Sequence, residues 1–340
     1  MKMKKEKEKS YSGIGGQAVL EGVMMRCNDQ YAVAVRKLDG EIEVEKRIIK
    51  GAEKLPFWKK TPFVRGMFQF VDSLKVGTQA LNYSASLFEE DDKEVVSEKK
   101  KKMKEKLEPV MMFFTMVLSF ALAIGIFMIL PYFITEIFSD YIQNQFIIAV
   151  IEGAIRIIIF VGYVFSISFM KDIKRLYGYH GAEHKCINCI EKGLPLTVDN
   201  VMKSSKLHKR CGTSFMLFVM LVSIVVFFFI NVDNIFLRVV LRIALLPVIA
   251  GISYELIRIA GKSENIIVKI LSAPGFWLQG LTTREPDRSM AEVAIASVEA
   301  VFDWKKFLNE EFGYVEEVAE EEVVSEEEYI DIEEIEDDEV

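Results

Sequence analysis

Residues 179–215 read YHGAEHKCINCIEKGLPLTVDNVMKSSKLHKRCGTSF, and this stretch holds all three histidines and three of the four cysteines of the chain. Long runs of apolar residues lie on both sides of it. A helix needs about 20 apolar residues to cross the hydrocarbon core of a bilayer. The histidines and cysteines therefore lie in a polar segment between two predicted membrane spans, at a membrane surface.

Four apolar runs predict four transmembrane helices. The first run contains no charged residue, and the others contain few. Because backbone polar groups cannot be left unpaired in hydrocarbon, each run is expected to be helical. The predicted spans cover residues 110–134, 146–170, 213–230 and 235–259.

The loops between these spans differ in positive charge, which predicts their orientation. The loop 171–212 contains nine Lys and Arg residues, whereas the loops 135–145 and 231–234 contain none. Basic loops remain in the cytoplasm. We therefore expect a multi-pass membrane protein with both termini and the loop 171–212 in the cytoplasm.

The net charge of −8 hides an uneven distribution of charge. Residues 310–340 contain 17 acidic residues and no Lys or Arg, so the rest of the chain carries −8 + 17 = +9. Runs of like charge predict disorder over 309–340, and over the basic lead 1–12. A charged linker, 89–109, carries a Lys cluster that anionic headgroups attract. The expected partners are the lipid bilayer and an unidentified substrate or protein, but no nucleic acid.

The start of the chain and the cysteines indicate the compartment. No apolar segment follows the basic lead, so it is not a cleaved export signal. Three of the four cysteines lie in a Lys-rich segment, which fits a reducing compartment better than a disulfide framework.

Residues 13–88 predict a small α+β cytoplasmic domain. The Gly-rich segment 13–26 indicates a turn and a buried segment, or a backbone that closely approaches another group. Alternation on both sides of Leu38-Asp39-Gly40 predicts a β-hairpin over 31–49. Residues 63–88 predict an amphipathic helix that either covers this domain or lies on the bilayer.

Residues 260–308 predict interfacial or cytoplasmic helices. We expect an interfacial or re-entrant helix over 266–281 with a break at its Pro-Gly pair. A second helix is expected over 289–308, with Ser289 and Glu292 as a capping box. The predicted fold class is an α-helical membrane protein with about four spans, a small N-terminal α+β domain and C-terminal interfacial helices.

His180, Glu183 and His184 form an H-x-x-E-H pattern. On a helix, positions i and i+4 share a face, so both imidazoles can bind one metal ion while Glu183 polarises a bound water. The third ligand would be His208 or Glu255, which topology places at the same membrane depth. The alternative is a hydrogen-bonded cluster, or a contact with lipid headgroups.

The cysteines predict a competing site. Cys186-x-x-Cys189 followed by His208-x-x-Cys211 has the spacing of a structural zinc site. Such a site would stabilise the loop and leave no open coordination position. Both metal hypotheses use His208, so one ion cannot satisfy both.

Charged residues inside the spans are costly and are therefore functional candidates. Glu152 and Arg156 are spaced i, i+4 in the second predicted span, as are Arg238 and Arg242 in the fourth. These four are expected to pair near the outer leaflet. They form either a structural ion-pair lattice or a polar path for a substrate or proton.

Several blocks together resemble the YqhQ-like family of bacterial multipass membrane proteins. The blocks are GGQAVLEGVMMR, PFVRGMFQFVDSLKVGTQAL, YHGAEHK, LHKRCGTSF, LPVIAGISYELIR and LQGLTTREPD, spread over most of residues 13–300. The family is a domain of unknown function, sometimes labelled a predicted metal-dependent enzyme. The positions that match the family's blocks are His180, Glu183, His184, His208, Cys211 and Glu255. Cys186 and Cys189 lie outside the family pattern, which weakens the structural-zinc hypothesis.

The leading functional hypothesis is a metal-dependent hydrolase at the cytoplasmic membrane face. It would bind a divalent metal ion, zinc in the first instance, and use Glu183 as the general base. Arg284 and Glu285 would orient the substrate. The alternatives are a non-catalytic membrane scaffold or assembly factor, and a small transporter that uses the charge pairs within the spans.

Overall fold

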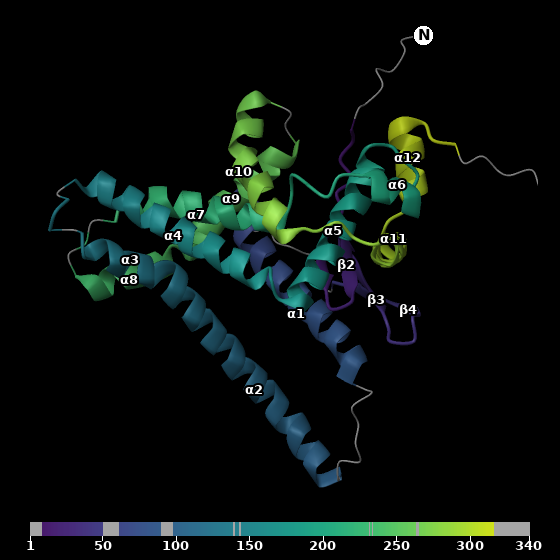
Figure 1. Ribbon diagram of the computed structural model, residues 1–340, viewed down its shortest axis with the longest axis horizontal. Helices are drawn as coiled ribbons and strands as arrows, with labels where there is room; N and C mark the ends of the chain where they lie inside the picture. Colours follow the sequence, from purple (N-terminus) through teal and green to yellow (C-terminus); the bar gives the residue numbers. More distant parts are fainter. Residues whose placement is uncertain are drawn as a thin grey trace, which may run out of the picture.

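The computed structural model describes residues 9–49, 61–89, 98–138, 140–142, 144–230, 232, 234–262 and 265–315. A sheet with its covering helices lies at one end of the molecule, and a bundle of apolar helices extends away from it (Figure 1). Disorder was predicted over 309–340 and 1–12, and most of both segments lies outside the described residues, as do residues 90–97 of the predicted linker 89–109. Residues 309–312 are instead the end of a helix, and residues 98–109 of the linker are helical.

The N-terminal part forms a four-stranded antiparallel sheet in the order β1-β2-β3-β4. Its strands are β1 (Gly15–Val19), β2 (Gly22–Cys27), β3 (Gln30–Arg36) and β4 (Ile42–Ile48). The pairing of β3 with β4 places Val33 opposite Glu45 and confirms the predicted hairpin. The Gly-rich segment 13–26, predicted as a turn and a buried segment or as a closely approaching backbone, forms a second hairpin, β1-β2, whose turn puts Glu21 at a φ of 49° and whose second strand is mostly buried.

Both faces of the sheet are covered by helices. Val23 and Ala32 lie in a core with α5 (Lys171–Glu191) and α11 (Arg288–Val301). Their strand neighbours Met24 and Val33 lie in a second core beneath α1 (Val64–Glu89). Because alternate side chains are buried on opposite faces, β2 and β3 are apolar at nearly every position.

Helix α1 packs on protein along part of its length. It contacts the sheet, and it also crosses α9 (Leu246–Lys262) through two glycines. A Cβ at Gly66 would lie 2.7 Å from Tyr254 Cβ, and a Cβ at Gly251 would lie 2.5 Å from the Phe63 carbonyl oxygen. Helix α1 therefore joins the sheet to the helix bundle, and its backbone lies against α9 because neither glycine has a side chain.

Three helical segments are long and apolar enough to cross a membrane: Val110–Glu136, Phe146–Ile167 and Phe236–Gly261. They comprise α2 (Glu98–Ile124), the π-helical turn η3 (Gly125–Ile129) and α3 (Leu130–Glu136), then α4 (Gln145–Ile167), and then α8 (Ile235–Ala244) with α9. The fourth apolar helix, α7 (Gly212–Phe228), has 17 residues and packs against both α4 and α9.

Prolines divide two of the predicted spans. Pro131 follows η3, and Pro247 lies just after the junction of α8 and α9. Proline has no backbone N–H, so each leaves the carbonyl four residues earlier without its helical donor. The predicted continuous spans over 110–134 and 235–259 are thus segmented helices.

The C-terminal helices differ from the prediction in two ways. Helix α10 (Ile266–Thr282) continues through Pro274 without a break, and its Gly275 lies against Ser214 of α7. The expected helix over 289–308 is two helices, α11 and α12 (Trp304–Phe312), and the cap of α11 is not Ser289. The Asp287 side chain accepts from the Met290 N–H at 2.8 Å, and an Asp carboxylate is a strong N-cap.

Candidate metal centre

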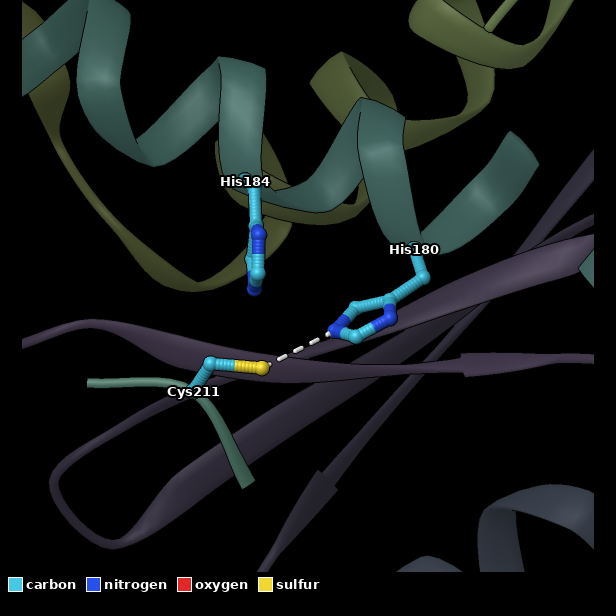
Figure 2. A group of neighbouring side chains, drawn as sticks. All are labelled: His180, His184 and Cys211. Carbon is cyan, nitrogen blue, oxygen red and sulfur yellow. Dashed lines mark hydrogen bonds between the residues drawn. The ribbon is translucent and has the colours of Figure 1, made fainter. Parts of the chain in front are cut away.

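Three side chains converge where the bundle meets the sheet: His180, His184 and Cys211. The ligand atoms they offer all lie within 4.8 Å of one another. Figure 2 shows both imidazole rings directed from α5 toward the Cys211 sulfur, which comes from the segment entering α7. The His180 Nε2 lies 3.3 Å from Cys211 Sγ. Within the described residues this is the group whose chemistry suits a metal ion.

Gly181 lies between the two histidines and has a structural role. A Cβ there would lie 2.0 Å from the carbonyl oxygen of Arg284, so the segment after α10 crosses α5 in direct backbone contact. In the same segment the Arg284 N–H donates to the Tyr177 carbonyl at 2.9 Å. Packing of this segment offsets the cost of glycine within a helix, about 1 kcal/mol relative to alanine.

Backbone carbonyls orient both imidazole rings. The Nδ1 of His180 lies 2.9 Å from the Thr282 oxygen, and the Nδ1 of His184 lies 2.6 Å from the Lys206 oxygen. A carbonyl oxygen only accepts, so each Nδ1 must carry the proton. The other nitrogen, Nε2, is then the one that can bind a cation in place of a proton, and this arrangement is typical of metal-ligating histidines.

The electrostatics of the group favour a thiolate. Burial opposes ionisation of Cys211, but the charges and hydrogen bonds of His180 and His184 outweigh it and hold the pKa of the thiol well below its usual range. Cys211 is also the N-cap residue of α7, where the helix dipole favours negative charge. Burial likewise opposes protonation of His180, but the Cys211 sulfur raises its pKa to about 9. Two imidazoles and a thiolate form a borderline-soft donor set that suits zinc.

Glu183 lies beside the group with spare hydrogen-bonding capacity. Its carboxylate is buried, and its Oε2 has no hydrogen-bond partner among the described residues. Burial raises the pKa of this carboxyl although His184 and His180 oppose the shift. A Cβ at Gly16 on β1 would lie 3.0 Å from Glu183 Cδ, so the Gly-rich segment does approach another group closely. An orphaned buried oxygen costs free energy unless a ligand, an ion or water satisfies it.

His208 lies near the group but has other partners. Its ring centroid is 5.7 Å from that of His184, and its Nε2 is 3.5 Å from the Glu191 carboxylate, which also pairs with Arg210. Burial lowers the pKa of His208 to about 4, so the ring is neutral near pH 7. Burial would raise the pKa of Glu191, but His208 and Arg210 outweigh it and lower that pKa strongly. His208 is thus a neutral neighbour of the group formed by His180, His184 and Cys211 (the His–Cys group) and is not one of its members.

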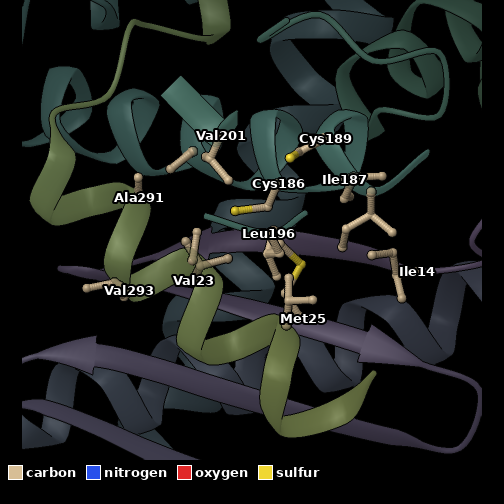
Figure 3. Packing of buried hydrophobic residues seen from close by; sticks show 14 of the residues in the cluster. Ile14, Val23, Met25, Cys186, Ile187, Cys189, Leu196, Val201, Ala291 and Val293 are labelled. Atoms are coloured by element: carbon tan, nitrogen blue, oxygen red, sulfur yellow. The ribbon is translucent and has the colours of Figure 1, made fainter. Parts of the chain in front are cut away.

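Cys186 and Cys189 lie in the apolar core to which α5, the sheet and α11 contribute (Figure 3). Burial raises the pKa of both thiols, that of Cys189 to about 11. The Cys189 Sγ lies 3.4 Å from the Pro195 carbonyl. The structure therefore brings Cys211 to the histidine pair and leaves the other two cysteines on a different face of α5.

The remaining candidates from the sequence lie outside the group. Glu255 on α9 pairs with Arg65 of α1, through Nε at 2.7 Å, and with Arg258 at 3.7 Å. Glu285 pairs with Lys185 at 2.9 Å, and the Arg284 guanidinium donates to the Ser168 carbonyl at 3.2 Å. These contacts position chain segments around the site.

Three of the four charges within the spans meet at one point. Glu152 accepts from Arg156 at 2.6 Å and from both terminal nitrogens of Arg242 at 2.7 and 2.8 Å. Arg238 instead donates to the Tyr132 hydroxyl at 3.0 Å.

A proline provides a further acceptor for this ion cluster. Arg156 Nε donates to the Phe127 carbonyl at 3.0 Å. Pro131, four residues later, has no N–H for that carbonyl, so the break in the helix creates the acceptor that the buried guanidinium uses.

Gln279 is a positioning residue that sequence reasoning missed. This fully buried side chain on α10 accepts from the His208 N–H at 2.9 Å and donates to the His208 carbonyl and to Ser214 Oγ, both at 2.8 Å. It fixes both flanks of Cys211. Its one signal in the sequence was its place in the block LQGLTTREPD, beside Thr282, whose carbonyl orients His180.

Comparison with known proteins identifies the family. Residues 61–304 match the family model described as "Protein of unknown function (DUF1385)". The chain is 39% identical over 296 residues to "Uncharacterized protein YqhQ" of Bacillus subtilis (strain 168), which covers 86% of this chain and 92% of the relative. No solved structure matches. The family match spans most of the chain, including all three members of the His–Cys group, and the chain belongs to the DUF1385 family.

Proposed function

We propose that this protein is a metal-dependent hydrolase of the membrane surface, with His180, His184 and Cys211 as the metal ligands and Glu183 as the general base. The observation that carries the proposal is the convergence of three ligand atoms within 4.8 Å, with both histidine Nδ1 atoms already bonded to carbonyls. A thiolate–imidazolium pair would need one histidine, whereas a metal ion uses both.

The chain supplies three ligands, and a catalytic zinc site typically has three ligands from protein. A bound zinc ion would supply an acidic water in its fourth position. Glu183 would accept the proton from that water, because its Oε2 has no hydrogen-bond partner among the described residues and burial raises the pKa of its carboxyl. Gly16 and Gln279 maintain the positions of Glu183 and Cys211.

The proposal includes a topology of four spans with both termini in the cytoplasm. Helix α7 packs against α4 and α9, so it lies at the same depth as two helices that are long enough to cross the bilayer. Seventeen residues rise roughly 25 Å, close to the thickness of a thin hydrocarbon core. With the basic loop 171–212 on the cytoplasmic side, the group of His180, His184 and Cys211 would lie at the cytoplasmic face.

Metal content tests the ligand set. Protein purified in mild detergent should retain about one equivalent of a transition metal, as measured by elemental mass spectrometry. His184→Ala and Cys211→Ser should each lose it. Cys189→Ser is the matched control, since its hydroxyl can donate to the same carbonyls and it should keep the metal. If the His184→Ala variant kept its metal and the Cys189→Ser variant lost it, the metal would instead be bound by the other cysteines.

Cobalt substitution tests whether the site has an open position. Added azide should change the visible spectrum of the cobalt-loaded protein if a water occupies the fourth position. Glu183→Gln should bind cobalt with an intact thiolate charge-transfer band, but it should abolish any hydrolysis that the wild-type protein shows in a panel of peptide, ester and phosphoester substrates. A spectrum that azide leaves unchanged would indicate a closed, structural site and would contradict catalysis.

The second candidate function is covalent catalysis by Cys211. The 3.3 Å contact between its sulfur and His180 Nε2 favours it, because a thiolate paired with an imidazolium is an activated nucleophile. Chloroacetamide labelling distinguishes the two functions. Under the metal hypothesis, Cys211 becomes reactive only after chelation, whereas a nucleophile is labelled in the protein as purified, and His180→Ala suppresses that labelling.

A further inference from the structure

A second polar site lies within the helix bundle, at the end remote from the sheet. A cavity of about 210 Å³ is lined by residues from the end of α3, the first half of α4, the end of α7 and the length of α8. Figure 1 shows α3 and α8 at the end of the bundle opposite the sheet. The cavity is therefore separate from the His–Cys group, which lies where the bundle meets the sheet.

The charges around this cavity do not cancel. Among the residues that the structure describes, three arginines and two glutamates line it, which leaves an excess of one positive charge. The arginines are Arg156, Arg238 and Arg242, and the glutamates are Glu136 and Glu152. An uncompensated cation among apolar helices is costly unless an anion accompanies it.

The arginines differ in how fully their donors are used. Each of the three Arg156 nitrogens has an acceptor, since they donate to Glu152, to the Phe127 carbonyl and to Ser223 Oγ. Arg242 binds Glu152 through both terminal nitrogens, but its buried Nε has no hydrogen-bond partner in the part of the chain that the structure describes. Arg238 donates to two neutral acceptors, the Val232 carbonyl at 2.7 Å and the Tyr132 hydroxyl at 3.0 Å. The spare donors and the excess charge thus belong to Arg238 and Arg242, which lie one helical turn apart on α8.

We propose that this cavity binds the phosphate group of an anionic ligand through Arg238 and Arg242. A guanidinium presents its donors in a fork that matches phosphate oxygens, and such bonds are strongest in a poorly solvated site. The apolar part of the lining, Phe227 and Ile224 among it, can contact the non-polar part of a ligand. The phosphate belongs either to a membrane lipid or to a free phosphate ion.

Two measurements on the full-length protein distinguish these sources. For a lipid, native mass spectrometry after extraction in mild detergent should show one retained phospholipid per chain. For a free anion, inorganic phosphate should raise the unfolding temperature of the delipidated protein, while chloride at equal ionic strength should not. Either result supports the site, and failure of both overturns it.

Matched variants locate the binding. Arg238→Gln removes one of the two proposed ligands and leaves the Glu152 ion pairs intact, so it should reduce occupancy or affinity by about tenfold. Arg258→Gln removes one charge from α9 outside the cavity and should bind as the wild-type protein does. Ala149→Leu fills the cavity without changing its charge and should also lose the ligand. Wild-type binding by both Arg238→Gln and Ala149→Leu would place the ligand elsewhere.

Discussion

At the scale of single residues, the H-x-x-E-H pattern correctly predicted that its own three residues lie together, but it did not predict which residue would complete the group. His180 and His184 share a face of α5, as their spacing requires, and Glu183 is buried beside them. The third member was Cys211, which spacing had assigned to a different site. Its position depends on Gln279, 68 residues later in the chain, and no local spacing could reveal that contact.

Gly181 gives the first prediction. Ala is normally the better helix former, by about 1 kcal/mol. At this position its Cβ would lie 2.0 Å from a backbone oxygen, so Gly181→Ala should instead destabilise the protein by about 1–3 kcal/mol. Thermal unfolding measures the change. Gly162→Ala on α4, where a Cβ meets nothing within 4 Å, is the control and should be neutral or slightly stabilising. Equal effects of the two substitutions would contradict the close approach.

His208 gives a prediction on pH. Its folded pKa is about 4, below the usual 6.5, so the unfolded chain binds a proton first as the pH falls. The free energy of unfolding should therefore drop by roughly 3 kcal/mol between pH 6.5 and pH 4, at about 1.4 kcal/mol per pKa unit. Glu191, whose pKa is depressed, contributes a further loss only below its usual value of 4.5. The groups that face the His208 ring are Glu191, Arg210 and His184.

Removing the imidazole tests this dependence on pH. His208→Gln should flatten the stability profile between pH 6.5 and pH 4.5 and leave the loss below pH 4.5. Chemical unfolding in detergent, with both proteins stripped of metal, keeps the titration of the other histidines common to both. An unchanged slope in His208→Gln would show that another group causes the loss.

At the scale of elements, prediction succeeded where one side of an element faces water and failed where both are buried. Strand β4 alternates partly buried and exposed residues, so the β3-β4 hairpin could be recognised from its sequence. Strand β2 has the sequence GVMMRC and is covered by α5 and α11 on one face and by α1 on the other. Because both faces are buried, its residues do not alternate between apolar and polar. In the same way, Pro274-Gly275 indicated a break but instead brings α10 against α7, since Gly275 lies on Ser214.

The crossing of α1 and α9 gives a prediction at this scale. A Cβ at Gly66 would lie 2.7 Å from Tyr254 Cβ and 3.0 Å from Gly251 Cα, so Gly66→Ala must push the helices apart. The Arg65–Glu255 ion pair next to it should then lengthen. We expect a loss of about 1–3 kcal/mol in stability and faster protease cleavage near residues 61–66. Gly280→Ala on α10, which meets nothing within 4 Å, is the control. Unaltered cleavage in Gly66→Ala would show that the crossing tolerates a side chain.

At the scale of the whole molecule, the His–Cys group joins two parts of different character. Its histidines lie on α5, which packs against the sheet, and its cysteine begins α7, which packs among the apolar helices. The carbonyl that orients His180 belongs to Thr282, the last residue of α10. A metal ion bound here would therefore connect the sheet domain with the helix bundle, in addition to any catalytic role.

Metal removal should accordingly uncouple the two parts. A ligand that binds only the folded state stabilises it by RT ln(1 + [L]/Kd), so chelation should lower the unfolding temperature of the wild-type protein by several degrees and leave Cys211→Ser unchanged. Trp304 in α12 reports on the sheet domain and Trp277 in α10 on the bundle. In a Trp58→Phe background, each is followed alone after replacing the other with Phe. The two probes should unfold together in the metal-loaded protein and at separate temperatures after chelation. Coincident transitions in both states, with an unfolding temperature that chelation does not change, would mean that no metal ion joins the two parts.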